Sequence, residues 1–207
     1  RHAEEERFAR AMRQRDILVR EVHHRIKNHL QGIAGLLRQH SQAHPALSGV
    51  VDVAVARIRS VAQVHGLQGE GGQVNLVALV RAIAASATAP VSSGLEGVAP
   101  PLPALDEDES VPVALIVNEL VQNAIKHATG PGVHIDMDGD QHGTRVVVRN
   151  LGRLPASIDI RTGQHTGTGL DLVRALLPRS GVDISLVAEG NEVRATLTLR
   201  PPVVVAV

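Results

Sequence analysis

Apolar residues recur at helical spacing through the first part of the chain. The stripe consists of Val19, Val22, Ile26, Leu30, Ile33 and Leu37. A period of 3.6 residues places them on one face, which predicts an amphipathic helix. This helix should end near His44, because the residue before a proline is pushed out of the helical region. A second stripe, from Leu47 to His65, predicts another long helix, so the two form an antiparallel hairpin.

The apolar face of each of these helices is too broad for the other helix to cover alone. Pairing of two hairpins into a four-helix bundle would bury both faces, so we expect a homodimer. Residues 1–16 are highly charged and lead into the first helix without a breaker. We expect this stretch to be an exposed or coiled helix that arrives from an upstream domain. The chain begins with Arg1 rather than Met, so we expect it to be a fragment.

After a glycine-rich linker at residues 66–72, the hydrophobic pattern becomes a mixture of helical and alternating segments. The expected elements are helices at about Leu76–Ala89, at Val111–Ala128 and from Gly169, and strands at Val133–Met137, Thr144–Arg149, Asp183–Ala188 and Val193–Leu199. Asp106–Ser110 is expected to be an acidic loop, and residues 151–168 a polar one. This order of elements indicates a mixed α/β domain after the helical hairpin.

The composition excludes several classes of partner. Phe8 is the only aromatic residue, so base stacking is not available and no nucleic-acid partner is expected. Lys and Arg together number 21, as do Asp and Glu, which gives no general attraction to phosphate backbones or anionic membranes. The absence of cysteine fits a reducing, cytoplasmic location. No apolar run is long enough to span a bilayer, so no direct membrane contact is expected.

The polar face of the first helix carries a histidine. His24 points about 150° away from the apolar stripe, with Glu21 one turn before it and Asn28 one turn after it. An imidazole held in water on a rigid helix is free to act as a nucleophile, and its polar neighbours set its tautomer. A lone surface histidine is more often simply solvated, and from these residues alone that alternative stays open. His23 and His29 border the apolar stripe and are expected to pack or to make dimer contacts.

Two further groups of polar residues occur in the α/β part. Glu119, Asn123 and Lys126 share an arc of about 60° on one predicted helix. Carboxylate and amide oxygens together hold a hard cation such as Mg²⁺, and a lysine balances phosphates that the cation carries. A solvated helix face is an equal alternative. Downstream, the run Gly167-Thr168-Gly169-Leu170 opens a helix whose free N–H groups favour an anion, although such a glycine pair alone marks only a turn.

Three motifs, in this order, resemble those of bacterial sensor histidine kinases. His24-Arg25-Ile26-Lys27-Asn28 resembles the phosphoacceptor box that reads H-R-x-K-N. Asn118–Ala128 resembles the N box of the ATPase domain shared with gyrase and the Hsp90 chaperone, and Gly167–Val173 is similar to the later glycine box of that domain. The resemblance implies an α plus α/β architecture. A helical-hairpin dimerisation domain, a four-helix bundle in the dimer, is followed by an α/β-sandwich (GHKL) ATPase domain.

The resemblance also implies roles for these residues. His24 would take a phosphoryl group from ATP and pass it to an aspartate in the receiver domain of a response regulator. Asn123 would bind Mg²⁺, Lys126 and His127 would approach the phosphates, and Glu119 occupies the position of a general base in related ATPases. The expected domains are then an incoming signalling helix (1–16), a dimerisation and phosphotransfer domain (17–69) and an ATP-binding catalytic domain (75–207).

The chain departs from the family pattern after the phosphoacceptor histidine. Many histidine kinases have an acidic residue there, which takes the proton of the histidine, whereas this chain has Arg25. Glu21, Asn28 or Glu119 must then help, or the neutral ring needs no base.

A second departure lies in the first glycine box. The family pattern Asp-x-Gly-x-Gly appears as Asn150-Leu151-Gly152 without the second glycine, and Arg153 is expected to crowd the hinge of the nucleotide lid. Asn150 keeps a carbonyl oxygen for the adenine amino group but lacks the charge, which weakens that hydrogen bond by about 1–2 kcal/mol. The alternative is therefore a phosphotransfer or scaffold protein of the same architecture with weak or no ATP binding. A serine kinase acting as an anti-sigma factor on the same ATPase fold would not explain His24.

Overall fold

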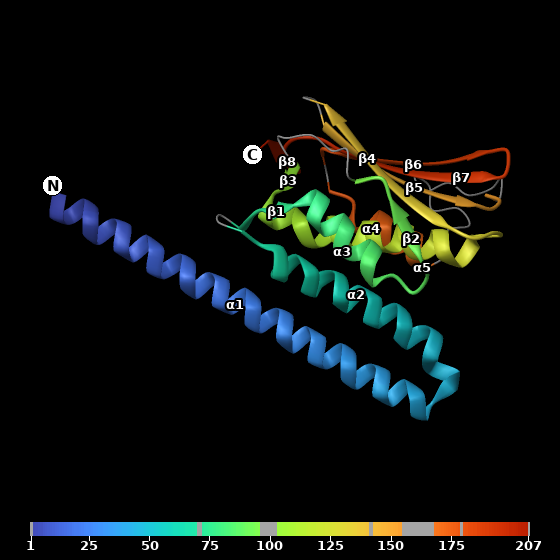
Figure 1. Ribbon diagram of the computed structural model, residues 1–207, viewed down its shortest axis with the longest axis horizontal. Coiled ribbons are helices and arrows are strands. Elements are labelled where there is room, and N and C mark those ends of the chain that lie inside the picture. Colours follow the sequence, from blue (N-terminus) through green and yellow to red (C-terminus); the bar gives the residue numbers. More distant parts are fainter. Residues whose placement is uncertain are drawn as a thin grey trace. The chain divides into compact units, whose positions relative to one another are not determined.

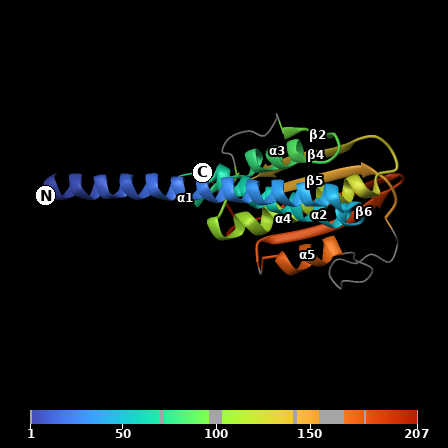
Figure 2. The same cartoon turned by 90° about the horizontal axis from the view of Figure 1, so that it is seen from below.

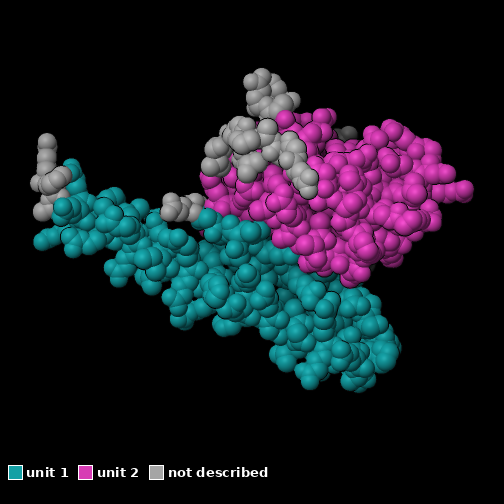
Figure 3. Space-filling model, in the orientation of Figure 1, with its two compact units in different colours: residues 1–72 teal, residues 73–207 magenta. Residues whose placement is uncertain are grey.

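The computed structural model describes residues 2–69, 72–95, 103–140, 143–154, 168–178 and 180–206. The chain divides into two compact units, residues 1–72 and residues 73–207, which Figure 3 shows in teal and magenta. In the part of the chain that the structure describes, every helix is too short or too polar to cross a bilayer.

The first unit is a helical hairpin. Its elements are α1 (His2–Ala43), the 3-10 helix η1 (Pro45–Leu47) and α2 (Ser48–Leu67). The long helices α1 and α2 run back along each other, as Figure 1 shows. His44 has φ −133° and ψ 75°, outside the helical region, because Pro45 follows it. The predicted end of the first helix is therefore confirmed.

The hairpin leaves much apolar surface uncovered. In the predicted stripe of α1, Val19, Val22 and Ile33 are exposed, whereas Leu30 and Leu37 are half-buried. Other large apolar side chains that are exposed in this unit are Phe8, Ile17, Leu18, Leu36, Leu47, Val50 and Val53. All but two of the exposed large apolar residues in the described ranges belong to the hairpin. An apolar surface of this extent is typical of an interaction site.

The second unit is built on two sheets. Its strands are β1 (Val74–Asn75), β2 (Val91–Ser93), β3 (Pro103–Leu105), β4 (Val133–Asp140), β5 (Gly143–Leu151), β6 (Val182–Glu189), β7 (Glu192–Leu199) and β8 (Val204–Ala206). The five-stranded sheet has the order β2-β4-β5-β7-β6, in which only β2 and β4 are parallel. The small antiparallel sheet has the order β1-β3-β8.

Three helices cover one face of the larger sheet. They are α3 (Leu76–Ser86), α4 (Glu107–His127) and α5 (Thr168–Leu176). Figures 1 and 2 show α4 between α3 and α5, in agreement with its contacts to both helices and to β5. Along β5, Val146, Val148 and Asn150 are buried, while Arg145 and Arg149 alternate with them toward the outer face. The predicted α/β sandwich is confirmed, with its core between sheet and helices.

The predicted acidic loop before α4 is wrong. Residues 107–110 form the first turn of α4, which begins four residues before the expected start at Val111. The side chain of Asp106 accepts a hydrogen bond from the backbone N–H of Asp108 at 3.1 Å, and three acidic residues follow in the first turn. Asp106 caps the helix, Glu107 and Asp108 complement its positive end, and α4 continues through Pro112, which removes one backbone hydrogen bond.

The other differences are smaller. α2 continues to Leu67, so Gly66 lies in its last turn and not in the linker. α3 ends at Ser86, three residues before the predicted end. Strands β1, β2, β3 and β8 have only two or three residues each and were not predicted, because segments so short carry no readable alternation.

Candidate active site

His24 is exposed on α1. Its ring nitrogen Nδ1 is 3.4 Å from the amide Nδ2 of Asn28, one turn further along the helix. Glu21, one turn before His24, is held by Arg25, whose guanidinium Nη2 lies 2.6 Å from its carboxylate. Of the two neighbours on α1 that were candidates to assist His24, Asn28 is therefore the one that contacts its imidazole.

A second polar cluster forms where α5 meets α4. A Cβ atom built on Gly169 would lie 2.7 Å from Oε2 of Glu119 and 3.4 Å from Oδ1 of Asn123. The exposed fraction of Glu119 is 4%, so its carboxylate is not part of a solvated helix face. The missing side chain at Gly169 therefore lets the first turn of α5 approach both polar groups of α4.

A third contact lies at the end of β5. Asn150 is 6% exposed, and its amide Nδ2 donates a hydrogen bond to the carbonyl oxygen of Leu151 at 3.1 Å. A Cβ atom on Gly152 would lie 2.8 Å from that amide nitrogen and 2.8 Å from the carbonyl oxygen of His127. Gly152 thus allows the end of α4 to approach the end of β5. The amide N–H of Asn150 is thus bonded within the protein. The oxygen Oδ1 of the same amide is its acceptor for a ligand.

The remaining predicted site residues differ in what their side chains can do. Lys126 and His127 are both exposed in the last turn of α4. Leu170 is 9% exposed, so its side chain belongs to the core and only its backbone N–H can contact a ligand. Thr168 is the first residue of α5, whereas Gly167 lies outside the described residues. Arg153, which we expected to crowd the nucleotide lid, has an exposed side chain.

The residues between α4 and α5 fit a cation that carries phosphates. The amide Nδ2 of Asn123 is buried and has no hydrogen-bond partner among the described residues. Buried polar groups are normally paired, so an unpaired amide here is typical of a site that binds a polar ligand. Glu119 and Asn123 supply oxygen atoms of the kind that Mg²⁺ prefers. The backbone N–H groups at the start of α5 suit a phosphate oxygen.

The first turn of α4 contains an acidic group with a perturbed pKa. Burial raises the pKa of Glu109 above its ordinary value, and the negative charges of Asp106 and Asp108 add to this effect. Glu109 is two or more helical turns before Glu119 and belongs to the capping region of α4. We therefore assign this effect to the stability of α4 and not to the candidate site.

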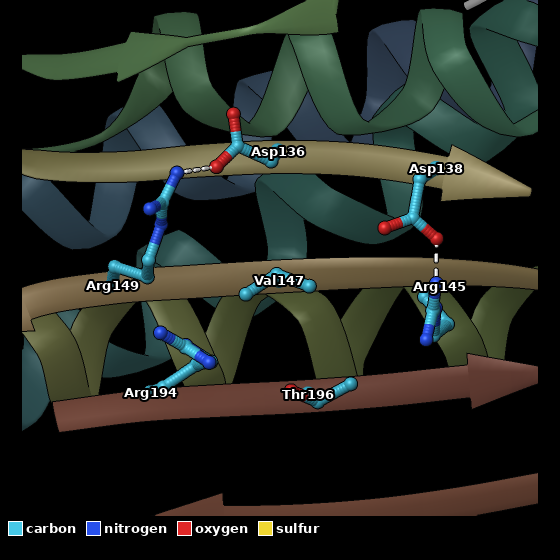
Figure 4. Close-up of a pocket in the computed structure, with 7 residues that line it drawn as sticks. All are labelled: Asp136, Asp138, Arg145, Val147, Arg149, Arg194 and Thr196. Atoms are coloured by element: carbon cyan, nitrogen blue, oxygen red, sulfur yellow. Dashed lines mark hydrogen bonds and ion pairs between the residues drawn. The ribbon is translucent and has the colours of Figure 1, made fainter. Parts of the chain in front are cut away.

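The outer face of the large sheet carries a separate charged surface. Asp136 and Asp138 of β4 pair with Arg149 and Arg145 of β5, the second pair at 2.7 Å (Figure 4). A hollow of about 390 Å³ there is lined by Asp136, Asp138, Arg145, Val147, Arg149, Arg194 and Thr196. None of these residues was predicted as a site residue, and the sheet separates them from the side chains that face α4. Since its acidic and basic groups largely neutralise each other, we interpret this surface as a solvated sheet face.

One contact in the hairpin was missed by sequence reasoning. His23 was expected to pack or to contact a second copy, and its Nδ1 lies 3.1 Å from Nδ1 of His65 within the same chain. The sequence places His65 only at the end of the second apolar stripe. The available signal was that His65 ends one apolar stripe while His23, 42 residues earlier, borders the other. This signal does not specify which residues meet.

Two family models match the chain. Residues 21–88 match the model described as histidine kinase. Residues 108–204 match the model described as histidine kinase-, DNA gyrase B- and HSP90-like ATPase. The first model covers the hairpin from Glu21 onward and the second covers the α/β unit from α4 to β8.

Proteins of known name and structure are similar to this chain. The sensor histidine kinase PdtaS of Mycobacterium tuberculosis (strain CDC 1551 / Oshkosh) is 32% identical over 217 residues, which cover 97% of this chain and 42% of PdtaS. The chain thus spans less than half of the length of that relative. The histidine kinase domain of the blue-light activated histidine kinase EL346 from Erythrobacter litoralis has a TM-score of 0.59 at 21% identity, covering 89% of this chain and 91% of that domain. Full-length ShkA in complex with AMPPNP has a TM-score of 0.50 at 16% identity, covering 93% of this chain and 47% of ShkA.

Proposed function

We propose that this chain, which belongs to the histidine kinase family, is a sensor kinase core that phosphorylates His24 from ATP and passes the phosphoryl group to an aspartate of a response regulator. One observation carries the proposal: an exposed imidazole on the hairpin accompanies a polar cluster in the ATPase unit, in which the buried Glu119 lies beside the half-buried Asn123 and Gly169. The first supplies a nucleophile and the second suits a magnesium nucleotide.

We infer from the contact between Asn28 and His24 which ring nitrogen reacts. A side-chain amide can present either its N–H or, after a half turn, its oxygen to Nδ1. If the oxygen of Asn28 accepts from Nδ1–H, the lone pair of His24 lies on Nε2, at the exposed end of the ring. This is the tautomer in which His24 is an effective nucleophile, so we assign to Asn28 the role of holding it.

In the transfer step, the Nε2 lone pair of His24 forms a bond to the γ-phosphorus of ATP. The bond from that phosphorus to the β–γ bridging oxygen breaks, and its electron pair leaves with ADP. The ring becomes positively charged and then loses its Nδ1 proton to water, because Asn28 is not a base. No acidic residue at the position of Arg25 is required for this sequence.

The nucleotide is assigned to the α4 and α5 side of the ATPase unit. Bound Mg²⁺ would neutralise phosphate charge as it develops. Asn123 would hold the cation through Oδ1, with Glu119 beside it, and the N–H groups from Thr168 to Leu170 would bind phosphate oxygens. Lys126 and His127, both exposed, are free to approach the phosphates. Oδ1 of Asn150 would accept from the adenine amino group.

The hairpin is assigned to dimerisation. The exposed apolar residues of α1 and α2 are of the kind that a four-helix bundle buries between two copies. The expected setting is the cytoplasm, and the expected partner is the receiver domain of a response regulator.

Labelled ATP with Mg²⁺ tests the proposal directly. The chain should acquire a label that is stable in base and labile in acid, and His24→Gln should remove it. His29→Gln is a matched control, because His29 is also exposed on α1 and should leave the label unchanged. Label that persists in His24→Gln would identify another acceptor. A wild-type chain that binds no ATP at millimolar concentration would favour the phosphotransfer or scaffold alternative.

A further inference from the structure

The H-R-x-K-N box divides between two faces of α1. His24 and Asn28 are exposed, whereas His23 and Lys27 are half-buried against the last turn of α2. His23 meets His65, and the side chain of Lys27 lies against the next residue, Gly66. A Cβ atom on Gly66 would come within 2.9 Å of Cδ of Lys27, so a larger residue there would displace this lysine. His65 and Gly66 of α2 therefore contact His23 and Lys27 of α1, which are one helical turn apart.

The hydrogen bonds of His65 specify where its proton lies. Its Nδ1 is 3.0 Å from Oε1 of Gln68 and 3.1 Å from Nδ1 of His23. We assign the hydrogen to Nδ1 of His65, because the amide of Gln68 presents Oε1 to this nitrogen and an amide oxygen can only accept. Nδ1 of His23 must then accept the same hydrogen, which leaves the proton of His23 on Nε2. The ring centroids are 5.3 Å apart, which is close to the largest separation that a 3.1 Å contact between two ring nitrogens allows. The two Nδ1 atoms therefore lie close to the line that joins the centroids.

We propose that His65 is a positioning residue for the phosphorylation of His24, an inference that rests on the proposed function. His23 and His24 are consecutive in α1, and the helix directs them to different sides. A bond that holds His23 against α2 therefore fixes the rotation of this turn about the helix axis. It thereby fixes the direction in which the imidazole of His24 points. The contact between Lys27 and Gly66 restrains the rotation of the next turn of α1 in the same way.

Only one hydrogen can lie between Nδ1 of His23 and Nδ1 of His65, which are 3.1 Å apart. If both Nδ1 atoms carried hydrogens, two donors and two positive charges would face each other at 3.1 Å. The other groups that the described residues of the hairpin place beside this pair are Gln68, which is neutral, and Lys27, whose positive charge disfavours a second cation further. A second proton on this pair would therefore open the contact and release the turn that carries His24.

Three variants of the full chain separate positioning from simple packing. His65→Leu keeps the volume but loses the hydrogen bond, and should lower the rate of label uptake by about tenfold while helix content and ATP affinity are kept. His65→Asn places an amide nitrogen close to the position of Nδ1, donates to His23 and does not titrate. It should restore the rate to within about threefold of wild type at neutral pH. His40→Asn is the control, because His40 is exposed and, among the described residues, its ring contacts the carbonyl oxygen of Leu36 in its own helix.

The pH dependence of the rate of label uptake separates positioning from packing, because a packing role alone would not change it. The informative quantity is the rate of wild type divided by that of His65→Asn, because both proteins carry the same His24. This ratio should fall by about tenfold on acidification, because a second proton at the contact separates His23 from His65 but not from an asparagine amide. A ratio that stays constant, or a His65→Asn variant as slow as His65→Leu, would overturn the proposal.

Ring-nitrogen NMR distinguishes failure of this proposal from failure of the proposed function. At neutral pH, long-range proton–nitrogen spectra should find His65 protonated on Nδ1 and His23 on Nε2. His65→Leu should change the signals of His23 and of its neighbour His24, while those of His40 remain. Any other tautomer of the pair would refute the positioning contact even if His24 is phosphorylated. A wild-type chain with the expected spectra that takes no label would refute the proposed function instead.

Discussion

Gly169→Ala is the sharpest perturbation of the candidate nucleotide site. The new Cβ would lie 2.7 Å from Oε2 of Glu119, so the carboxylate must move by about 0.7 Å to reach an ordinary contact of 3.4 Å. Backbone atoms are not among the nearest neighbours of this position, and the carboxylate is the end of a flexible side chain. The least costly response is therefore a displaced Glu119, followed by Asn123, in an intact fold.

The expected magnitudes differ between stability and function. Extra volume in a packed region costs about 1–3 kcal/mol, and replacing a helical glycine by alanine returns about 1 kcal/mol. The free energy of unfolding should thus change by no more than about 2 kcal/mol. The dissociation constant of Mg-ATP should rise by about tenfold, which corresponds to about 1.4 kcal/mol. Label uptake by His24 should fall by on the order of 100-fold, because a misplacement of about 1 Å has effects of this size.

Calorimetry with Mg-ATP, thermal unfolding and labelled ATP measure these three quantities. Gly49→Ala is a matched control, because Gly49 is the second residue of α2 as Gly169 is of α5, and its Cβ would meet no atom within 4 Å. It should gain a little helix stability and keep ATP affinity. If Gly169→Ala bound Mg-ATP as tightly as Gly49→Ala does, the contact between α4 and α5 would not be part of the nucleotide site.

Asn150→Asp should tighten ATP binding by about tenfold, but not GTP binding, and should lower the stability of the free protein by about 1–2 kcal/mol because the amide N–H donated to a backbone carbonyl is lost. Equal ATP affinities of the two proteins in calorimetry would contradict this. Val50→Asp places a charge at a site that is 73% exposed in one chain, and light scattering should then find a helical monomer; an unchanged dimer would exclude this face from the interface. Burial and two neighbouring aspartates raise the pKa of Glu109, so the folded state binds its proton more tightly than the unfolded state and loses stability as pH rises through the carboxyl range. Glu109→Gln should therefore be more stable than wild type at pH 7, by at most about 0.5 kcal/mol after solvent screening, and this difference should vanish below about pH 4. A difference that is the same in thermal scans at both pH values would refute this assignment.

Local backbone geometry made much of the fold predictable. The apolar stripe of α1 and the proline after His44 specify a long helix and its end, because helix periodicity and proline sterics act over a few residues. Alternation along β4, β5 and β7 likewise predicted the paired strands. The start of α4 was misplaced because Pro112 resembles a first-turn residue, whereas the cap from Asp106 lies further upstream.

The sequence by itself determined which chemistry is present: an imidazole on a polar helix face, an acid and an amide one turn apart, and glycines before a helix. Tertiary structure alone decided which of these groups meet. Gly169 approaches Glu119 across 50 residues of chain, and His23 bonds His65 across 42. The pairs Glu21–Arg25 and His24–Asn28 are different, because each joins residues four apart on one helix and so follows from the helix itself. The physical reason is that periodicity reports the geometry of one helix or strand, whereas the partner of a polar group depends on how side chains pack and compete for the same hydrogen bonds.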